Sequence, residues 1–80
     1  MPLPQSTLTR SAWVGHLFVV RAYMTDVCSE PRLGTAAFGR KLGSTGIVLS
    51  IPDQTWGFVV FTDGKLGWVL LREITVNYAK

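Results

Sequence analysis

The chain has 80 residues, the length of one small domain, and a chain of this size buries only about 60% of the surface that its unfolded form exposes. Eight basic and five acidic side chains give a formal net charge of +3 without any run of basic residues, which excludes a basic tail. Charged residues make up 16% of the chain, against an average of about 25%. We therefore expect apolar surface outside the core, as at an oligomer interface, a partner surface or a ligand groove.

Cys28 is the only cysteine, which excludes a disulfide within the chain and is typical of a reducing compartment. Residues 12–20 form an apolar stretch, but it contains His16, is followed by Arg21 and lacks a small-residue cleavage site. We therefore expect no signal peptide, and the stretch is too short to cross a membrane. The expected protein is cytoplasmic, of bacterial or phage origin, without membrane association.

The N-terminal part of the chain predicts a flexible arm followed by a strand. Residues 1–11 hold two of the four prolines together with Gln, Ser and Thr, and they show no apolar period. Residues 12–24 are rich in β-branched, aromatic and aliphatic side chains without helical spacing, which predicts a strand. This strand would open a single domain that spans residues 12–80.

Residues 25–43 predict a long loop. Asp26, Pro31, Gly34 and Gly39 interrupt any regular element longer than a few residues. Loops of this length are uncommon inside compact domains and tend to be functional. We therefore expect this loop to take part in recognition.

The rest of the chain predicts four short strands joined by tight turns, at residues 46–51, 56–61, 66–71 and 75–78. In the turn after the first of them, Pro52 presets φ and Asp53 can bond its own backbone. Asp63 and Gly64 form the Asp-Gly pair typical of a tight hairpin. Residues 71–74 predict one 3₁₀ turn before the last strand.

This order of elements resembles an SH3-like barrel, and several motifs are similar to those of bacterial SH3 domains. In chain order they are Ser29-Glu30-Pro31, Leu42-Gly43, Trp56, residues 63–69 and Ile74. The resemblance implies an all-β fold, a single five-stranded SH3-like barrel with a long loop after the first strand. Binding of cell-wall peptides, common among secreted bacterial SH3 domains, is disfavoured because no export signal is visible.

A second resemblance points to another partner. Gly43, Gly46, Val48 and Ile51 are similar to the Gly-x-x-Gly-x-Val-x-x-Ile pattern of KOW-type SH3-like barrels, which occur in ribosome- and transcription-associated proteins. This resemblance implies a nucleic-acid or ribosome-associated module that holds phosphates with basic side chains. The candidate phosphate contacts are Arg32, Arg40, Lys41 and Lys65.

The strand at residues 56–61 is apolar on both faces, with Trp56 and Phe58 on one face and Val59 and Phe61 on the other. Only one face of a small barrel points inward, so the other must be covered by the loop, a second subunit or a ligand. The SH3 resemblance implies that Val59 and Phe61 lie inside. Because Trp and Tyr dominate binding hot spots, the candidate partner-binding residues are Tyr23, Trp56, Phe58 and Trp68.

The sequence indicates no catalytic site, metal site or cofactor. A metal site needs three or four converging ligands, and the chain offers one histidine, His16, and one cysteine. Nothing beside Ser29, Ser44 or Cys28 indicates an activated nucleophile, and no phosphate-binding motif is present. Type II dihydrofolate reductases are similar in size and barrel type, but residues 67–70 stand where that family has its Val-Gln-Ile-Tyr pore stretch.

We therefore predict a non-enzymatic binding module that recognises a protein or peptide partner, or a second copy of itself, through exposed aromatics and the long loop. The alternative is a KOW-like nucleic-acid or ribosome-associated module. A more remote alternative is a small oligomeric enzyme of the type II dihydrofolate reductase kind.

Overall fold

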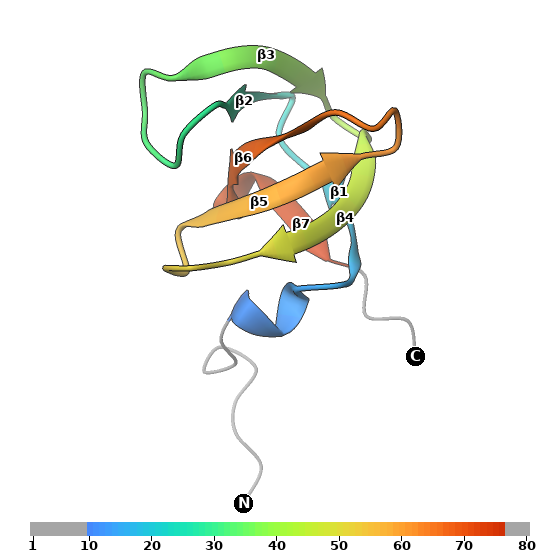
Figure 1. Ribbon diagram of the computed structural model, residues 1–80. Coiled ribbons are helices and arrows are strands. Elements are labelled where there is room, and N and C mark those ends of the chain that lie inside the picture. The colour runs from blue at the N-terminus through green and yellow to red at the C-terminus, as the bar shows by residue number, and fades with distance from the viewer. Residues whose placement is uncertain (1–9, 77–80) are drawn as a thin grey trace, which may run out of the picture.

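The computed structural model describes residues 10–76, which form one antiparallel sheet of seven strands (Figure 1). The strands are β1 (Leu17–Val20), β2 (Met24–Cys28), β3 (Ala36–Lys41), β4 (Thr45–Ser50), β5 (Trp56–Phe61), β6 (Leu66–Leu70) and β7 (Ile74–Val76). Two 3₁₀ helices, η2 (Arg10–Trp13) and η3 (Leu71–Glu73), accompany them. The fold is all-β, as predicted.

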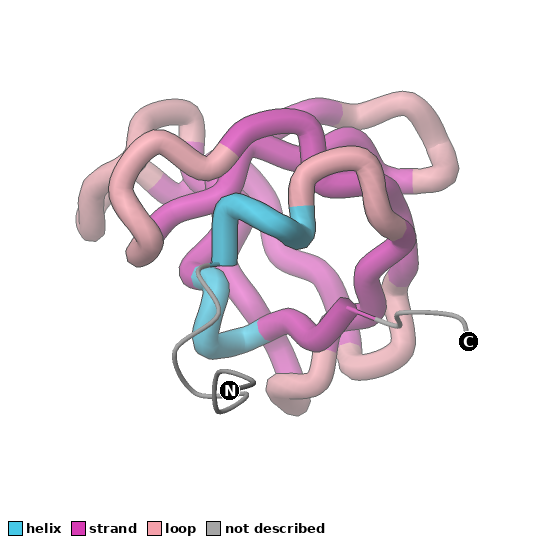
Figure 2. Tube along the Cα trace, turned by 90° about the horizontal axis from the view of Figure 1, so that it is seen from below, coloured by secondary structure: helices cyan, strands magenta, loops and turns pink. Residues whose placement is uncertain are grey.

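The strands lie in the order β3-β2-β6-β5-β4-β1-β7, so β3 and β7 are the two edges of the sheet. These edges do not pair with each other, and the sheet is therefore not closed into a barrel by backbone hydrogen bonds. Seen from below, the strands curve around the centre of the molecule, and the 3₁₀ helices lie across the near end (Figure 2).

The five-strand prediction is wrong because the loop predicted at residues 25–43 contains two strands. β2 and β3 pair as a hairpin, with Thr25 opposite Arg40 and Val27 opposite Phe38. Asp26 and the glycine opposite it are tolerated because they lie on the exposed side of this hairpin, whereas Thr25 and Val27 are buried. Only residues 29–35 remain as the connecting loop.

The single strand predicted at residues 12–24 is also wrong. Gly15, with a φ of 87°, turns the chain between η2 and β1. Residues 21–23 then bend the chain from β1 into β2. The arm predicted at residues 1–11 falls outside the described residues, except that Arg10 and the residue after it begin η2.

The later strands follow the prediction closely. β5 has the predicted bounds, β4 begins and ends one residue earlier than predicted, and β6 ends one residue earlier. β7 begins one residue early, and residues 77–78 of the predicted last strand lie outside the described residues. The predicted turn is confirmed, since Asp53 Oδ1 accepts hydrogen bonds from the N–H groups of Thr55 and Trp56, both at 3.1 Å.

The core lies on the inner face of the curled sheet. Its buried side chains are Phe18, Val20, Val27, Val48, Ile51, Val59, Phe61, Val69, Leu71 and Ile74. Phe18 and Phe61 meet edge to face with their ring centroids 5.4 Å apart. Val59 and Phe61 lie inside, as the resemblance implied.

Gly46 lets β4 approach β5 and Phe18 closely. A Cβ built at this position would collide with the Val60 carbonyl oxygen and would lie 2.9 Å from Phe18 Cε1 and from Phe61 Cα. We expect Gly46→Ala to cost about 3 kcal/mol or more, because backbone atoms of β5 must move. For a domain of this size, that cost lowers Tm by roughly 12 °C or more, which thermal unfolding followed by circular dichroism measures.

Gly39→Ala is the matched control, since a Cβ there first meets the flexible end of Met24, with Sδ at 3.2 Å. We expect its Tm to stay within about 4 °C of the wild-type value, because a shift of that size corresponds to about 1 kcal/mol or less. Equal stability of Gly46→Ala and Gly39→Ala would contradict the close packing of β4 on β5.

Candidate functional site

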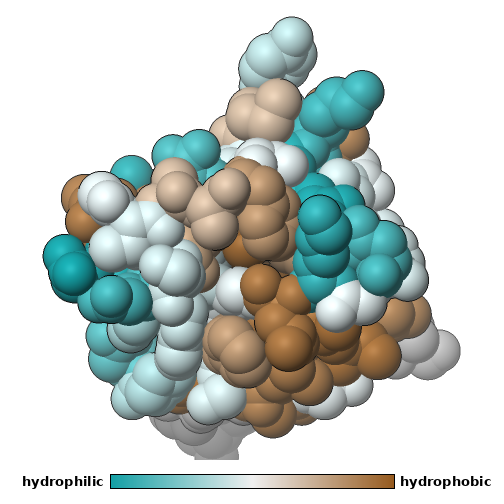
Figure 3. Space-filling view, turned by 45° about the horizontal axis from the view of Figure 1, so that its top comes forward, coloured by the Kyte–Doolittle hydropathy of each residue, from teal (hydrophilic) through white to brown (hydrophobic). Residues whose placement is uncertain are grey.

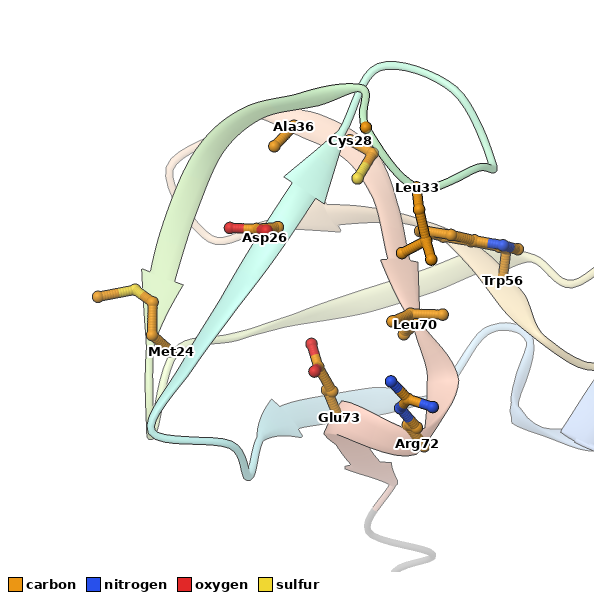
Figure 4. A pocket seen from close by; sticks show the side chains of 10 residues that line it. Met24, Asp26, Cys28, Leu33, Ala36, Trp56, Leu70, Arg72 and Glu73 are labelled. Carbon is orange, nitrogen blue, oxygen red and sulfur yellow. The ribbon is translucent and has the colours of Figure 1, made fainter.

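A pocket of about 240 Å³ opens where the β2–β3 hairpin, the start of β5 and η3 meet (Figure 4). Its lining residues are Met24, Asp26, Cys28, Leu33, Gly34, Ala36, Trp56, Leu70, Arg72 and Glu73. Sites for small molecules usually measure about 300–1,000 Å³. This pocket is smaller, and it fits one or two side chains of a larger ligand better than a cofactor.

The pocket combines apolar walls with a charged margin. Figure 4 shows Leu33 from the 29–35 loop and Trp56 from β5 on one side, with Arg72 and Glu73 projecting from η3. Asp26 adds a second carboxylate from β2. Two carboxylates against one guanidinium favour a ligand that carries positive charge, although the whole chain has a net charge of +3.

Hydrogen bonds hold the elements of the pocket together. The buried hydroxyl of Thr25 on β2 donates to Glu73 Oε1, which fixes this carboxylate against the hairpin. Arg21 Nε donates to the backbone oxygen of Arg72 at 3.0 Å. The N–H of Leu71 donates to the backbone oxygen of Thr55 at 2.9 Å, so η3 is tied to the turn before β5 as well. The pocket is therefore formed before any ligand arrives.

The structure brings together three of the four predicted partner-binding aromatics. Phe58 and Trp68 lie opposite each other on β5 and β6, with ring centroids 5.0 Å apart. Trp56, on the same face of β5, lines the pocket and is 6% exposed. Tyr23 is 88% exposed in the bend before β2 and lies outside the pocket lining.

The predicted phosphate contacts are divided between two places. Arg32 lies in the 29–35 loop, where its Nε is 2.8 Å from the neighbouring Glu30 carboxylate. Arg40 and Lys65 lie over the ring of Phe38, with Arg40 Cζ and Lys65 Nζ at 5.0 and 5.4 Å from its centroid. Lys41 is exposed at the end of β3.

Arg40 attaches the edge strand β3 to the β5–β6 turn. Its Cζ lies 4.8 Å from the centroid of Phe61, and its Nη2 donates to Asp63 Oδ2 at 2.7 Å. Arg40 Nε is buried without a hydrogen-bond partner, and the contact of the guanidinium with the Phe38 and Phe61 rings offsets the cost. This guanidinium is therefore part of the packing.

Sequence reasoning located the loop side of the pocket but missed the other side. Asp26, Leu33 and Ala36 lie within the segment predicted to take part in recognition. Arg72 and Glu73 were missed because η3 is far from the hairpin in the sequence and lies beside it only in the folded chain. Burial alternates along Met24–Cys28, but the sequence does not, because the exposed Met24 is apolar and the buried Thr25 is polar, so hydrophobic alternation gave no signal for a strand there.

Within residues 10–76, no group of three or more His, Cys, Asp or Glu side chains gathers in a way that could hold a metal ion. In the same part of the chain, no helix has the length and apolar character needed to cross a membrane.

Comparisons with protein-family models, with curated proteins and with solved structures found no match to this chain. The candidate function therefore depends on the geometry of the pocket and of the sheet.

The ion pair of Arg40 with Asp63 gives a pH-dependent contribution to stability. The hydrogen bond from Arg40, and then the one from the Lys65 N–H, hold the pKa of Asp63 below its ordinary value. The contribution is therefore complete above the unfolded-state pKa of about 3.9 and is lost as the pH falls through the lower folded-state pKa. We expect the Tm of the wild type to fall more steeply below about pH 4 than that of Asp63→Asn.

Glu30→Gln is the control for this measurement, because it removes an ion pair whose side chains are 55% and 66% exposed and such pairs contribute little. Its Tm should follow the wild-type pH profile in the same thermal scans. An Asp63→Asn profile as steep as that of the wild type would show that the Arg40 pair does not stabilise the fold.

Proposed function

We propose that this protein is a non-enzymatic binding module of SH3-like architecture that holds a peptide or an extended segment of a partner protein in the pocket beside η3. The observation that carries the proposal is the pocket itself, which is preformed, combines apolar with charged lining residues and is sized for side chains.

The strand connections support the SH3-like part of the proposal. The five strands predicted for the barrel correspond to β1, β4, β5, β6 and β7, and the β2–β3 hairpin occupies the place of the predicted long loop. After η3, β7 returns to pair with β1, where Val20 lies opposite Ile74. Side chains of Phe38 and Arg40 then bring β3 over the core.

The lining of the pocket indicates the chemistry of its ligand. Trp56, Leu33 and Leu70 offer apolar and aromatic surface for one large apolar side chain. The carboxylates of Asp26 and Glu73 favour a lysine or arginine beside it. We therefore expect a ligand with a basic residue next to a large apolar one.

A nucleic acid fits these residues less well. Of the four candidate phosphate contacts, Arg32 pairs with Glu30 and Arg40 pairs with Asp63. Each guanidinium therefore already faces a carboxylate, whose negative charge opposes the attraction of a phosphate. Lys41 and Lys65 alone make a small electrostatic footprint for RNA or DNA.

Leu33→Ser tests the proposed site, because Leu33 is 74% exposed and lines the pocket without belonging to the core. Peptides are first selected from a random phage-displayed library on the wild-type protein, and their affinity is then measured by fluorescence anisotropy. We expect the selected peptides to be rich in Lys or Arg beside large apolar residues. Leu33→Ser should weaken their binding by about tenfold, the effect of losing about 1.4 kcal/mol.

Leu42→Ser is the matched control, since Leu42 is 61% exposed but lies outside the pocket lining. It should bind the selected peptides as the wild type does. Failure to select any peptide, or equal loss in both variants, would contradict the proposal. Binding of a labelled single-stranded RNA that weakens steeply with salt, without peptide binding, would favour the nucleic-acid alternative.

A further inference from the structure

One row of aliphatic side chains crosses four adjacent strands on the side of the sheet away from the core. Leu17 on β1 lies opposite Ile47 on β4, and Ile47 lies opposite Val60 on β5. Val60 in turn lies opposite Leu66 on β6. Residues directly opposite on antiparallel strands share a face, and Phe18, which follows Leu17, points into the core. The four side chains therefore form one row on the outer face.

Three members of this outer row are exposed, and Val60 is half-buried between them. Leu17 is 61% exposed, Ile47 39% and Leu66 53%, and Leu49 in the neighbouring irregularity of β4 is 42% exposed. In Figure 3 the largest brown, hydrophobic area lies low on the face in view, where β5 and its neighbours present their outer side. Single exposed apolar residues are normal, whereas a contiguous group marks an interaction surface.

The chemistry of the row points to a second copy of this chain. No residue of β1, β4, β5 or β6 is charged. A nucleic acid or a charged partner would find no group to pair with there, whereas a second copy brings an equally uncharged face and keeps its net charge of +3 outside the contact. We propose that the outer face of β1, β4, β5 and β6 is the interface of a homodimer, an inference that does not rest on the proposed peptide binding.

The size of the face suits such a contact. Weak interfaces bury up to about 600 Å² on each partner, which is roughly an eighth of the accessible surface of 5149 Å². Four strands of four to six residues, about 4.8 Å apart and rising about 3.3 Å per residue, present a face of roughly 300 Å², which is within this range. The dimer is therefore a weak one whose population depends on protein concentration.

The order of the strands makes the row complementary to itself. A two-fold axis between the two sheets, parallel to the strands and between β4 and β5, sets Leu17 of one copy opposite Leu66 of the other. The same axis sets Ile47 opposite Val60. This is the isologous arrangement usual in homodimers, and it packs two sheets face to face through apolar side chains.

The row lies at the far end of this face from the pocket. Leu70, which lines the pocket, follows Leu66 by four residues along β6. At about 3.3 Å per residue, their separation is about 13 Å. A dimer formed through the row could therefore present two pockets.

Analytical ultracentrifugation of the full chain, from low micromolar to near millimolar concentration, tests the proposal. The weight-average mass of the wild type should rise from that of one 8.8 kDa chain toward twice that value. Leu17→Glu and Leu66→Lys should each weaken the dimer by about tenfold or more, because a charge is buried without a partner. The double variant Leu17→Glu/Leu66→Lys should recover much of the association, because the two charges then meet across the interface.

Leu42→Glu, outside the four strands, is the control and should associate as the wild type does. Circular dichroism establishes that each variant is folded; if Leu17→Glu does not fold, Leu66→Lys at the turn end of β6 decides alone. A wild type that keeps the mass of one chain at every concentration overturns the proposal and leaves the face to another partner. A dimer that survives in Leu66→Lys, or that Leu42→Glu disrupts equally, also overturns it.

Discussion

The β2–β3 hairpin is joined to the rest of the sheet by one backbone pair, between Cys28 and Trp68, so its position depends on side-chain contacts. Phe38 lies with its ring centroid 6.3 Å from that of Phe61 in the core. Arg40 lies over both rings and forms an ion pair with Asp63 in the turn between β5 and β6. These contacts bring the edge strand β3 over the core and curl an otherwise open sheet.

The position of the hairpin determines which surfaces of the sheet stay open to a ligand or a partner. Because β2 lies beside β6 and its connecting loop reaches Trp56, a pocket forms at the start of β5. The hairpin lies over the core side of the sheet, so Ile47 and Leu66 on the outer face stay exposed. β5, which is apolar on both faces, thus contributes side chains to the core, to the pocket and to the exposed apolar face.

Local signals allowed much of this fold to be predicted. The bounds of β5 follow from a short apolar run between two turns, and Asp53 marks one of those turns because its side chain accepts hydrogen bonds from the N–H groups of Thr55 and Trp56. The hairpin was missed because Pro31 and Gly34 suggested a loop throughout, whereas they occupy only its tip. The pocket joins residues more than forty positions apart, such as Asp26 and Glu73, and no local pattern reports such a contact.

The attachment of the hairpin through Arg40 is tested most directly by amide hydrogen exchange, measured by NMR on the wild type and on Arg40→Met. Methionine keeps the apolar stem of the arginine side chain but removes the charge that interacts with the Phe38 and Phe61 rings and with Asp63. The amides of β2 and β3 should exchange at least about tenfold faster in the variant, with those of β4 and β5 unchanged, because the hairpin opens locally. Unchanged exchange in the hairpin, or equal acceleration in every strand, would contradict this account.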